Sequence, residues 1–175
     1  FEPNDEYIDN TPQNMSPLFD EAEPLAEKET DESASAIKHY IKWNDQYKKA
    51  CKLIYGKDAK LNDFKKAEQL LLSESQRGNV LAVYDLGKLY STDKLGERNE
   101  ETSIAKYTRA LQGFLQIEPN SKKLKPYVQY RIGKMFCYGL GTEQNYQKAF
   151  EWFERSAKQK NKFAQFSLAN LYYYG

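Results

Sequence analysis

The chain has 175 residues, 40% hydrophobic and 14% aromatic, with a net charge of +1. This length holds one domain, or one domain with a tail. The sequence contains no run of 18 apolar residues, so it predicts no transmembrane helix and no membrane partner. It also shows no secretory signal. The two cysteines, Cys51 and Cys137, do not form a metal-ligand spacing, and we therefore expect a reduced, cytoplasmic setting without a cofactor.

The first 34 residues differ in charge from the rest of the chain. They contain 11 Asp or Glu, one Lys and four of the six prolines, whereas residues 35–175 contain 25 Lys or Arg and 14 Asp or Glu. A segment with high charge and few apolar residues buries too little surface to offset the entropy lost on ordering. We expect residues 1–34 to be an acidic linker or tail, disordered or loosely docked. Leu18 and Phe19 are candidates for a short apolar anchor within it.

From about residue 35 the sequence has the periodicity of amphipathic helices, and it repeats itself. Residues 63–90 align without a gap on residues 145–172 at an offset of 82. Residues 130–136 align with both copies, at offsets of 46 and 36, so the natural period is 36. The predicted units are a partial unit at about 35–56 and repeats at about 61–93, 99–141 and 144–175, the middle one with an insertion at 113–126.

Each unit is predicted to form two helices that pack through recurrent positions. A small residue recurs at one position, and glycine there costs a helix about 1 kcal/mol relative to alanine, so we expect a neighbouring helix to approach closely. The small residues are Cys51, Gly87, Gly133 and Ala169, and the other packing positions are Ala82, Ala164, Tyr84, Tyr130 and Phe166. Because stacked repeats need their last apolar face covered, we expect Tyr172–Tyr174 to continue into further repeats or to self-associate.

The glycine-rich stretch CYGLGTEQ is a candidate phosphate-binding loop. Such a loop follows a strand and opens a helix, but this stretch follows a predicted helix. We therefore expect Gly139 and Gly141 to end that helix in a left-handed conformation, with Thr142 or Asn145 capping the next one. His39 is the only histidine, and no catalytic or metal-binding set can be assembled around it. We predict that this segment is not an enzyme.

The pattern A-x-x-W-[YF]…G-N-x-x-A-x-[YF]-x-L-G-x-[LM]-Y-x-x-G-x-G resembles Sel1-like repeats, which are related to tetratricopeptide repeats, although Lys160 replaces the glycine before Asn161. The resemblance covers roughly residues 45–175 and is strongest over 62–90 and 145–175. It implies an all-α fold, a short right-handed α-solenoid of stacked antiparallel helix pairs. It also implies a scaffold that binds proteins or peptides along an extended groove.

Two binding hypotheses remain open. For a protein partner, the candidate contacts are the polar positions of the first helices, although an ordinary solvated face explains each one equally well: Arg109, Gln112, Lys148, Glu151, Arg155 and Lys158. For non-specific nucleic-acid binding, the candidates are Lys122, Lys123 and Lys125 of the insertion. No recognised nucleic-acid motif is present, and the acidic tail could cover the basic surface instead.

A narrower resemblance concerns the segments WNDQYKKACKLIYGKD, LAVYDLGKLY and YVQYRIGKMFCYGLGTEQNYQKAFEWFERSA. They are similar to the C-terminal repeat region of relaxases from mobile elements of Gram-positive bacteria. In those proteins an N-terminal nuclease domain nicks transfer-origin DNA with a tyrosine and a histidine-rich metal site. A single histidine cannot supply that site, and the chain opens without Met. The resemblance thus implies an accessory C-terminal part of a larger protein used in mobilisation.

Overall fold

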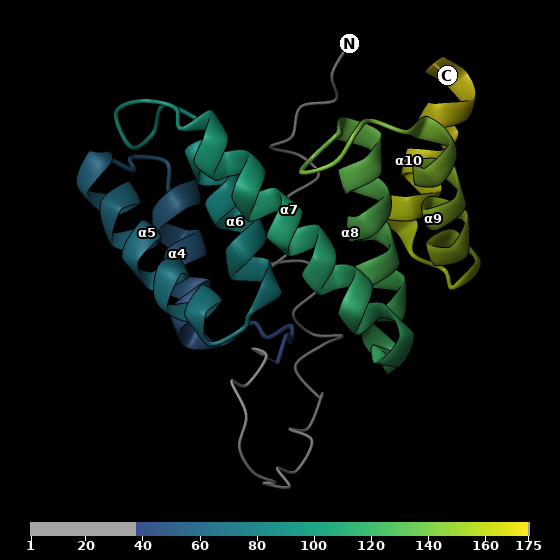
Figure 1. Ribbon diagram of the computed structural model, residues 1–175, viewed down its shortest axis with the longest axis horizontal. Helices are drawn as coiled ribbons and strands as arrows, with labels where there is room; N and C mark the ends of the chain where they lie inside the picture. The colour runs from purple at the N-terminus through teal and green to yellow at the C-terminus, as the bar shows by residue number, and fades with distance from the viewer. Residues whose placement is uncertain (1–37, 175) are drawn as a thin grey trace, which may run out of the picture.

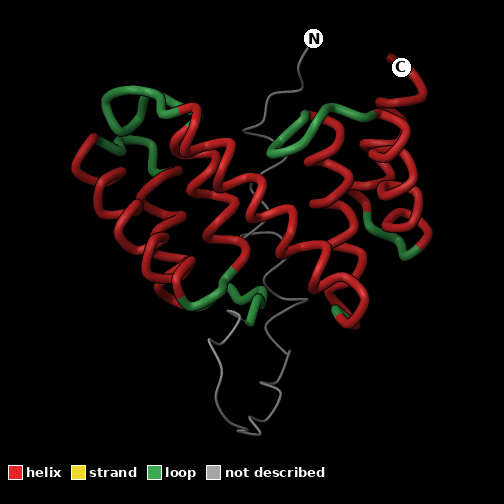
Figure 2. Tube along the Cα trace, viewed as in Figure 1, coloured by secondary structure: helices red, strands yellow, loops and turns green. Residues whose placement is uncertain are grey.

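A computed structural model describes residues 38–174 of the chain, and these residues are helical apart from short connections (Figures 1 and 2). The acidic segment 1–34, with its candidate anchor, lies outside the described residues. The only β-type pairing in the described part is an isolated bridge between Tyr40 and Asn79. The elements are α4 (Asp45–Tyr55), α5 (Leu61–Gln76), α6 (Val80–Tyr90), α7 (Glu100–Ile117), η1 (Glu118–Asn120), η2 (Lys122–Leu124), α8 (Lys125–Tyr138), α9 (Tyr146–Lys158) and α10 (Lys162–Tyr174).

The helices stack in two layers. Each consecutive pair of α-helices from α4 to α10 is in contact, and Figure 1 shows α5 and α7 in front of α4 and α6. We call α4, α6, α8 and α10 the basic layer, for the reason given below, and α5, α7 and α9 the opposite layer. The expected all-α stack of helix pairs is confirmed.

Asparagine caps the N-termini of α4, α7 and α9. The side chains of Asn44, Asn99 and Asn145 accept hydrogen bonds of 2.9, 3.0 and 2.8 Å from backbone amides in the first turns of α4, α7 and α9. These bonds satisfy amides that have no partner within the helix. Gly139 ends α8 with φ +65°, and Gly141 follows with φ +67°. The glycine-rich stretch is therefore a helix C-cap and a turn, as expected.

The predicted insertion is largely helix. We expected residues 113–126 to separate two helices, but α7 runs for 18 residues to Ile117 and includes Gly113 and Phe114. Phe114 is fully buried, so the added turn of α7 contributes to the core. Pro119 follows within η1 and supplies no amide donor with which α7 could continue. The short helices η1 and η2 then lead into α8.

Two glycines in basic-layer helices hold the layers at close distance. A Cβ at Gly87 in α6 would lie 2.9 Å from the Tyr107 ring of α7, and a Cβ at Gly133 in α8 would lie 2.6 Å from the Phe153 ring of α9. Both distances are shorter than any real Cβ contact, so only glycine fits without a shift. Each aromatic ring is buried, which means that it interlocks a helix of the basic layer with one of the opposite layer.

The last helix departs from the repeat pattern. We expected Phe166 and Ala169 to pack like Tyr84 and Gly133, but both lie exposed, with 55% of Phe166 accessible. No helix follows α10 in the described residues to cover this face. The aligned positions Ala82, Ala164 and Tyr130 are buried, and Cys51 is only 6% exposed.

Asparagine also joins one repeat to the preceding one. The side-chain amide of Asn79 donates to the Lys42 carbonyl (2.8 Å), and Asn161, its counterpart at an offset of 82, donates to the Pro126 carbonyl (3.2 Å). The Asn79 bond connects the turn between α5 and α6 to the backbone just before α4. The Asn161 bond connects the turn between α9 and α10 to the first turn of α8. Repetition of the sequence therefore reproduces the same inter-unit hydrogen bond.

Candidate interaction surface

The predicted contact residues of α7 have different surroundings. Arg109 is half-buried, and its guanidinium donates to the Ser75 carbonyl at the end of α5 (3.5 Å). That contact connects α7 to α5, and a role of Arg109 in partner binding stays a prediction. Gln112 is exposed.

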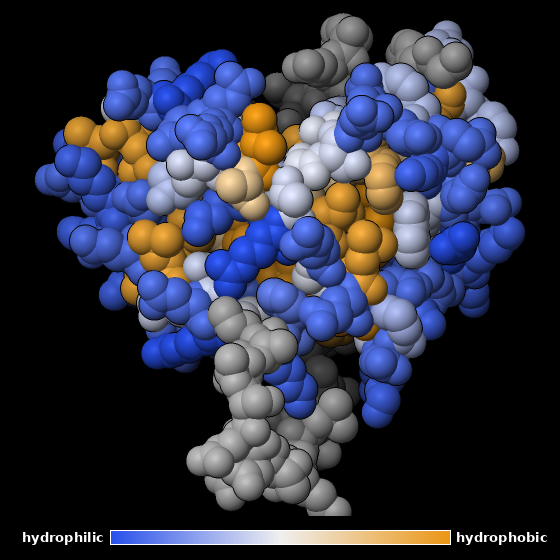
Figure 3. Space-filling view, in the orientation of Figure 1, coloured by the Kyte–Doolittle hydropathy of each residue, from blue (hydrophilic) through white to orange (hydrophobic). Residues whose placement is uncertain are grey.

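The predicted contact residues of α9 are all exposed, and they interact mainly with side chains of their own helix. Lys158 pairs with Glu154 (3.2 Å), and the Arg155 guanidinium lies 4.7 Å from the Trp152 ring centroid. Lys148 lies 5.3 Å from the Phe136 ring of α8. Exposed pairs of this kind contribute little to stability. The α9 set, Lys148, Glu151, Arg155 and Lys158, is the outer side of the opposite layer, which Figure 3 shows to be mostly hydrophilic.

The insertion lysines lie in the connection between α7 and α8 and at the first residue of α8. Lys122 and Lys123 in η2 are exposed, and Lys122 adopts a positive φ of 46°. Lys125 begins α8, and its ammonium donates to the Pro119 carbonyl (3.4 Å). The three charges are close in sequence.

Charge divides unevenly between the two layers. The basic-layer helices α4, α6, α8 and α10 carry eight Lys or Arg and only two acidic residues, Asp45 and Asp85. The opposite-layer helices α5, α7 and α9 carry seven Lys or Arg and seven Asp or Glu. Nearly all of the positive charge excess on the helices is therefore in one layer.

Within the basic layer, charged and aromatic side chains converge from three helices. The Tyr47 hydroxyl of α4 donates to the Asp85 carboxylate of α6 (2.5 Å), and both residues are buried. The Arg131 guanidinium of α8 lies 4.1 Å from the Tyr84 ring centroid and 5.6 Å from that of Tyr127. An arginine over aromatic faces is stabilised by the negative potential of the rings. α4, α6 and α8 are thereby bridged by side chains.

The electrostatics of this cluster follow from its burial. Burial raises the pKa of Tyr47 well above its ordinary value, and the Asp85 carboxylate raises it further, while Arg131 opposes both. Tyr47 is thus a neutral donor at every physiological pH. Arg131 and Lys134 are 2% and 4% exposed, so this layer holds charge in a poorly hydrated setting where electrostatic interactions are strong.

One lysine recurs in register on the three helices. Lys52, Lys88 and Lys134, which we call the register lysines, each follow directly the small residue of the repeat. The basic face is defined here as the register lysines with the buried cluster, namely Tyr47, Lys52, Tyr84, Asp85, Lys88, Tyr127, Arg131 and Lys134. The sequence alignment contained this signal, but we gave weight to the small residues and overlooked the lysines beside them.

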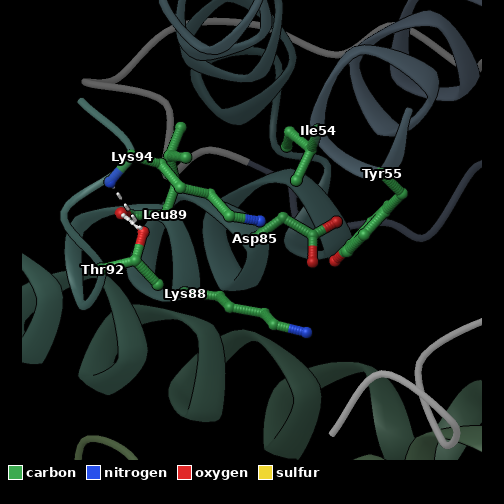
Figure 4. A pocket seen from close by; sticks show the side chains of 7 residues that line it. All are labelled: Ile54, Tyr55, Asp85, Lys88, Leu89, Thr92 and Lys94. Carbon is green, nitrogen blue, oxygen red and sulfur yellow. Dashed lines mark hydrogen bonds between the residues drawn. The ribbon is translucent and has the colours of Figure 1, made fainter. Parts of the chain in front are cut away.

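A small pocket opens at one edge of the basic face, between α4, α6 and the loop after α6 (Figure 4). The ammonium groups of Lys88 and Lys94 lie 5.4 and 5.8 Å from the Tyr55 ring centroid. Figure 4 shows the Lys94 side chain extending toward Asp85 and Tyr55. The pocket combines an apolar wall with cationic groups, and its lining residues are Ile54, Tyr55, Asp85, Lys88, Leu89, Thr92 and Lys94.

The described residues offer little for catalysis. Among them, no group of three or more His, Cys, Asp or Glu could hold a metal ion. Burial raises the pKa of the Cys137 thiol, although Lys134 opposes the shift, and a raised pKa lowers the fraction of reactive thiolate. Over residues 38–174, no helix combines the length and the apolar character needed to cross a bilayer.

The fold and this face define a tandem helical-repeat protein with one charged, aromatic side. Part of the chain is similar to Sel1 repeats: the model of the Sel1 repeat family matches residues 126–161 and 162–175. The matched frame places α8 and α9 in one unit, whereas our sequence alignment paired α9 with α10. The boundary between repeats of a tandem array can be drawn before either helix of a pair. The close packing of α8 on α9 at Gly133 agrees with the boundary in the family match.

Two known proteins are similar to parts of this chain. The putative sel1-like repeat-containing protein L18 of Acanthamoeba polyphaga mimivirus is 46% identical over 35 residues, which are 20% of this chain and only 6% of that protein. The crystal structure of a Sel1 repeat protein from Oxalobacter formigenes has a TM-score of 0.45 and 25% identity, covering 71% of this chain and 86% of that one.

Proposed function

We propose that this chain is a protein-interaction module that binds its partner on the basic face. The observation that carries the proposal is the concentration of cationic and aromatic side chains in one layer, with eight basic against two acidic residues on its helices. The family gives general support, because tandem helical repeats present extended surfaces to peptides and proteins. Tyrosine is also a residue type enriched at binding hot spots, and 40% of Tyr55 is exposed at the edge of this face.

The face defines the chemistry of the partner. Lys52, which is exposed, and Lys88, which is half-buried, favour carboxylates, and the exposed ring of Tyr55 at the pocket favours aromatic or aliphatic side chains. We therefore infer a partner segment that is acidic and contains apolar residues. Such a ligand would bind faster at low ionic strength, because opposite charges steer the encounter.

A displayed peptide library selected against the full chain tests this proposal. We expect the enriched peptides to be acidic with apolar residues, and to bind Lys52→Glu/Lys88→Glu at least about tenfold more weakly, equal to about 1.4 kcal/mol. The matched control, Lys65→Glu/Lys66→Glu, makes the same charge change on exposed residues of α5 and should change affinity less than about twofold. Equal weakening by the two variants, or no enrichment, would contradict the proposal.

Non-specific nucleic-acid binding is the second candidate function. It is favoured by the same concentration of positive charge, extended at one end by Lys122 and Lys123, which are exposed. Binding of this type depends on counterion release and weakens steeply with salt. A gel-shift titration of labelled duplex and single-stranded DNA with the full chain at 20 and 150 mM salt tests it. Absence of a shift at 20 mM salt removes this candidate, and a shift that survives Lys122→Ala/Lys123→Ala removes the role of these two lysines.

We further propose that the module is an accessory part of a larger protein such as a conjugative relaxase. What supports this step is the sequence similarity of three segments of the repeat region to relaxase C-terminal regions. In such a parent, the nicking chemistry would reside elsewhere and the repeats would recruit a partner. The sequence of the complete gene tests it: a histidine-cluster nuclease domain upstream supports the proposal, and a different domain there contradicts it.

A further inference from the structure

The chain contains two parts of nearly equal and opposite charge. Residues 1–34 hold 11 acidic residues and one lysine, whereas residues 35–175 hold 25 basic and 14 acidic residues. The acidic part also includes apolar residues beside its carboxylates, as in PLFDEAEPL. These are the features that the basic face favours in a partner. The chain therefore carries its own candidate ligand.

The acidic segment is attached close to the basic face. Tyr40 exchanges two backbone hydrogen bonds with the turn before α6, donating to the Gly78 carbonyl (3.0 Å) and accepting from the Val80 amide (2.9 Å). The Trp43 ring then lies edge-on to Tyr127 of α8, with centroids 5.2 Å apart. Tyr127 also contacts the Arg131 guanidinium. Residues 40–43 are thus fixed beside the aromatic cluster, and the acidic segment joins the chain a few residues earlier.

The attached length is more than sufficient to reach every part of the face. At about 3.3 Å per extended residue, 34 residues span up to about 110 Å, whereas the 11-residue helix α4 is only about 17 Å long at about 1.5 Å per residue. A ligand on a short tether has an effective concentration in the millimolar range. Even a weak electrostatic contact would therefore be populated within one molecule.

We propose that residues 1–34 dock in cis on the basic face and compete with the external partner. This inference rests on the proposed function, because it assigns the same face a second occupant. The carboxylates of the segment pair with Lys52 and Lys88, and Leu18 and Phe19 pack on Tyr55, of which 40% is exposed at the edge of the face. Partner binding then requires displacement of the segment, which makes the module autoinhibited and its affinity dependent on ionic strength.

Carbodiimide cross-linking of the full chain at about 1 µM, where intramolecular contact dominates, tests the docking directly. The reagent joins a carboxylate to an adjacent lysine without a spacer. Mass spectrometry of the monomer band should find the carboxylates of residues 2–32 joined mainly to Lys48, Lys52 and Lys88 of the basic layer, with the yield falling at 500 mM salt. Cross-links that are as frequent to Lys65 and Lys66 of α5, or that occur only in dimers, would overturn the proposal.

A matched pair of charge variants tests the competition. Asp20→Asn/Glu21→Gln/Glu23→Gln/Glu27→Gln removes four charges from the acidic segment, and Glu97→Gln/Glu100→Gln/Glu101→Gln/Glu143→Gln removes four from exposed positions of the repeats. We expect the first variant to bind a library-selected peptide at least about fivefold more tightly than wild type, and the second to change binding less than about twofold. Equal affinity of the first variant and wild type would overturn competition.

The two proposals fail separately. If selected peptides bind and depend on the register lysines, but the segment neither cross-links to them nor competes, the proposed function stands and autoinhibition is wrong. If the segment cross-links to the basic face but the affinity of the peptides does not depend on the register lysines, the docking stands and the face is not the partner site.

Discussion

The two layers of the stack use similar helices for different purposes. The opposite layer balances seven basic with seven acidic residues, and it supplies the aromatic rings of Tyr107 and Phe153 that insert against the glycines of the basic layer. The basic layer supplies those glycines and concentrates charge beside them. The rings of the opposite layer therefore fix the spacing between the layers, and the helices of the basic layer carry the excess of positive charge.

The difference between the layers arises from neighbouring positions of the repeat. The small residue of each unit must pack, so Cys51, Gly87 and Gly133 are buried. The residue directly after it is rotated by about 100° around the helix, and in three successive units that residue is lysine. Packing thus determines the first position, and the lysine after it is exposed at Lys52, half-buried at Lys88 and buried at Lys134.

The largest expected effect tests the interlock between the layers. Phe153→Ala should lower the free energy of unfolding by about 3–5 kcal/mol, because the ring is buried against Gly133. Phe166→Ala removes the same side chain from α10, where 55% of it is exposed, and should cost less than about 1 kcal/mol. Urea denaturation followed by circular dichroism measures both. Similar losses would show that α10 is covered in solution.

The next effect concerns the polar contacts at the turn between layers. Glu74 is fully buried and accepts hydrogen bonds from the side chains of Asn44 (2.7 Å) and Asn79 (3.1 Å). Glu74→Ala would leave both amides without this acceptor and should cost about 2–3 kcal/mol. Glu97→Ala, at an exposed position, is the control and should change stability by less than about 0.5 kcal/mol. The same denaturation assay decides, and a small loss for Glu74→Ala would contradict this role.

A smaller effect concerns the link between two helices of the basic layer. Tyr47→Phe removes the buried hydroxyl that donates to Asp85, with an expected cost of about 1–2 kcal/mol. Tyr146→Phe removes a hydroxyl from an exposed residue and should be nearly neutral. If Tyr47→Phe also proves neutral by thermal denaturation, the charged cluster is not needed to join α4 to α6.

The smallest effect is a pH dependence at the attachment point of the acidic segment. Burial lowers the pKa of His39, the Arg109 guanidinium lowers it further, and a hydrogen bond with the Gly78 backbone opposes the shift. The unfolded chain therefore binds a proton more readily than the folded one, and stability falls as the pH drops below about 6.5. His39→Gln should make the free energy of unfolding less dependent on pH between 7 and 5.5. An unchanged slope would contradict this account.

Sequence reasoning captured the parts of the fold that depend on local chemistry. The cap at Asn145, the left-handed Gly139 and the stack of helices all follow from residue type and periodicity. The errors arose where context outweighs the repeat. Phe166 and Ala169 match buried positions in the alignment, but burial also requires a following helix. Likewise, α7 continues through Gly113 because Phe114 is buried. The 36-residue period of the repeats does not predict this extension.

The candidate site was harder to predict than the fold. Periodicity identifies polar positions on every helix, and we selected those of α7 and α9, one of which, Arg109, instead bonds to the α5 carbonyl of Ser75. The convergence of Tyr47, Asp85 and Arg131 depends on three helices that are distant in sequence. The register lysines were the available signal, because a charge that recurs at the same repeat position recurs on the same side of the stack.

The central claim is that the basic layer, and not the opposite layer, receives the partner. Amide chemical shifts of the ¹⁵N-labelled full chain, recorded during titration with a library-selected acidic peptide, test this most directly. The account predicts that the perturbed amides cluster in α4, α6 and α8, around Lys52, Lys88 and Lys134, and that the perturbation is lost in Lys52→Glu/Lys88→Glu. Perturbations concentrated on α5, α7 and α9 would contradict it.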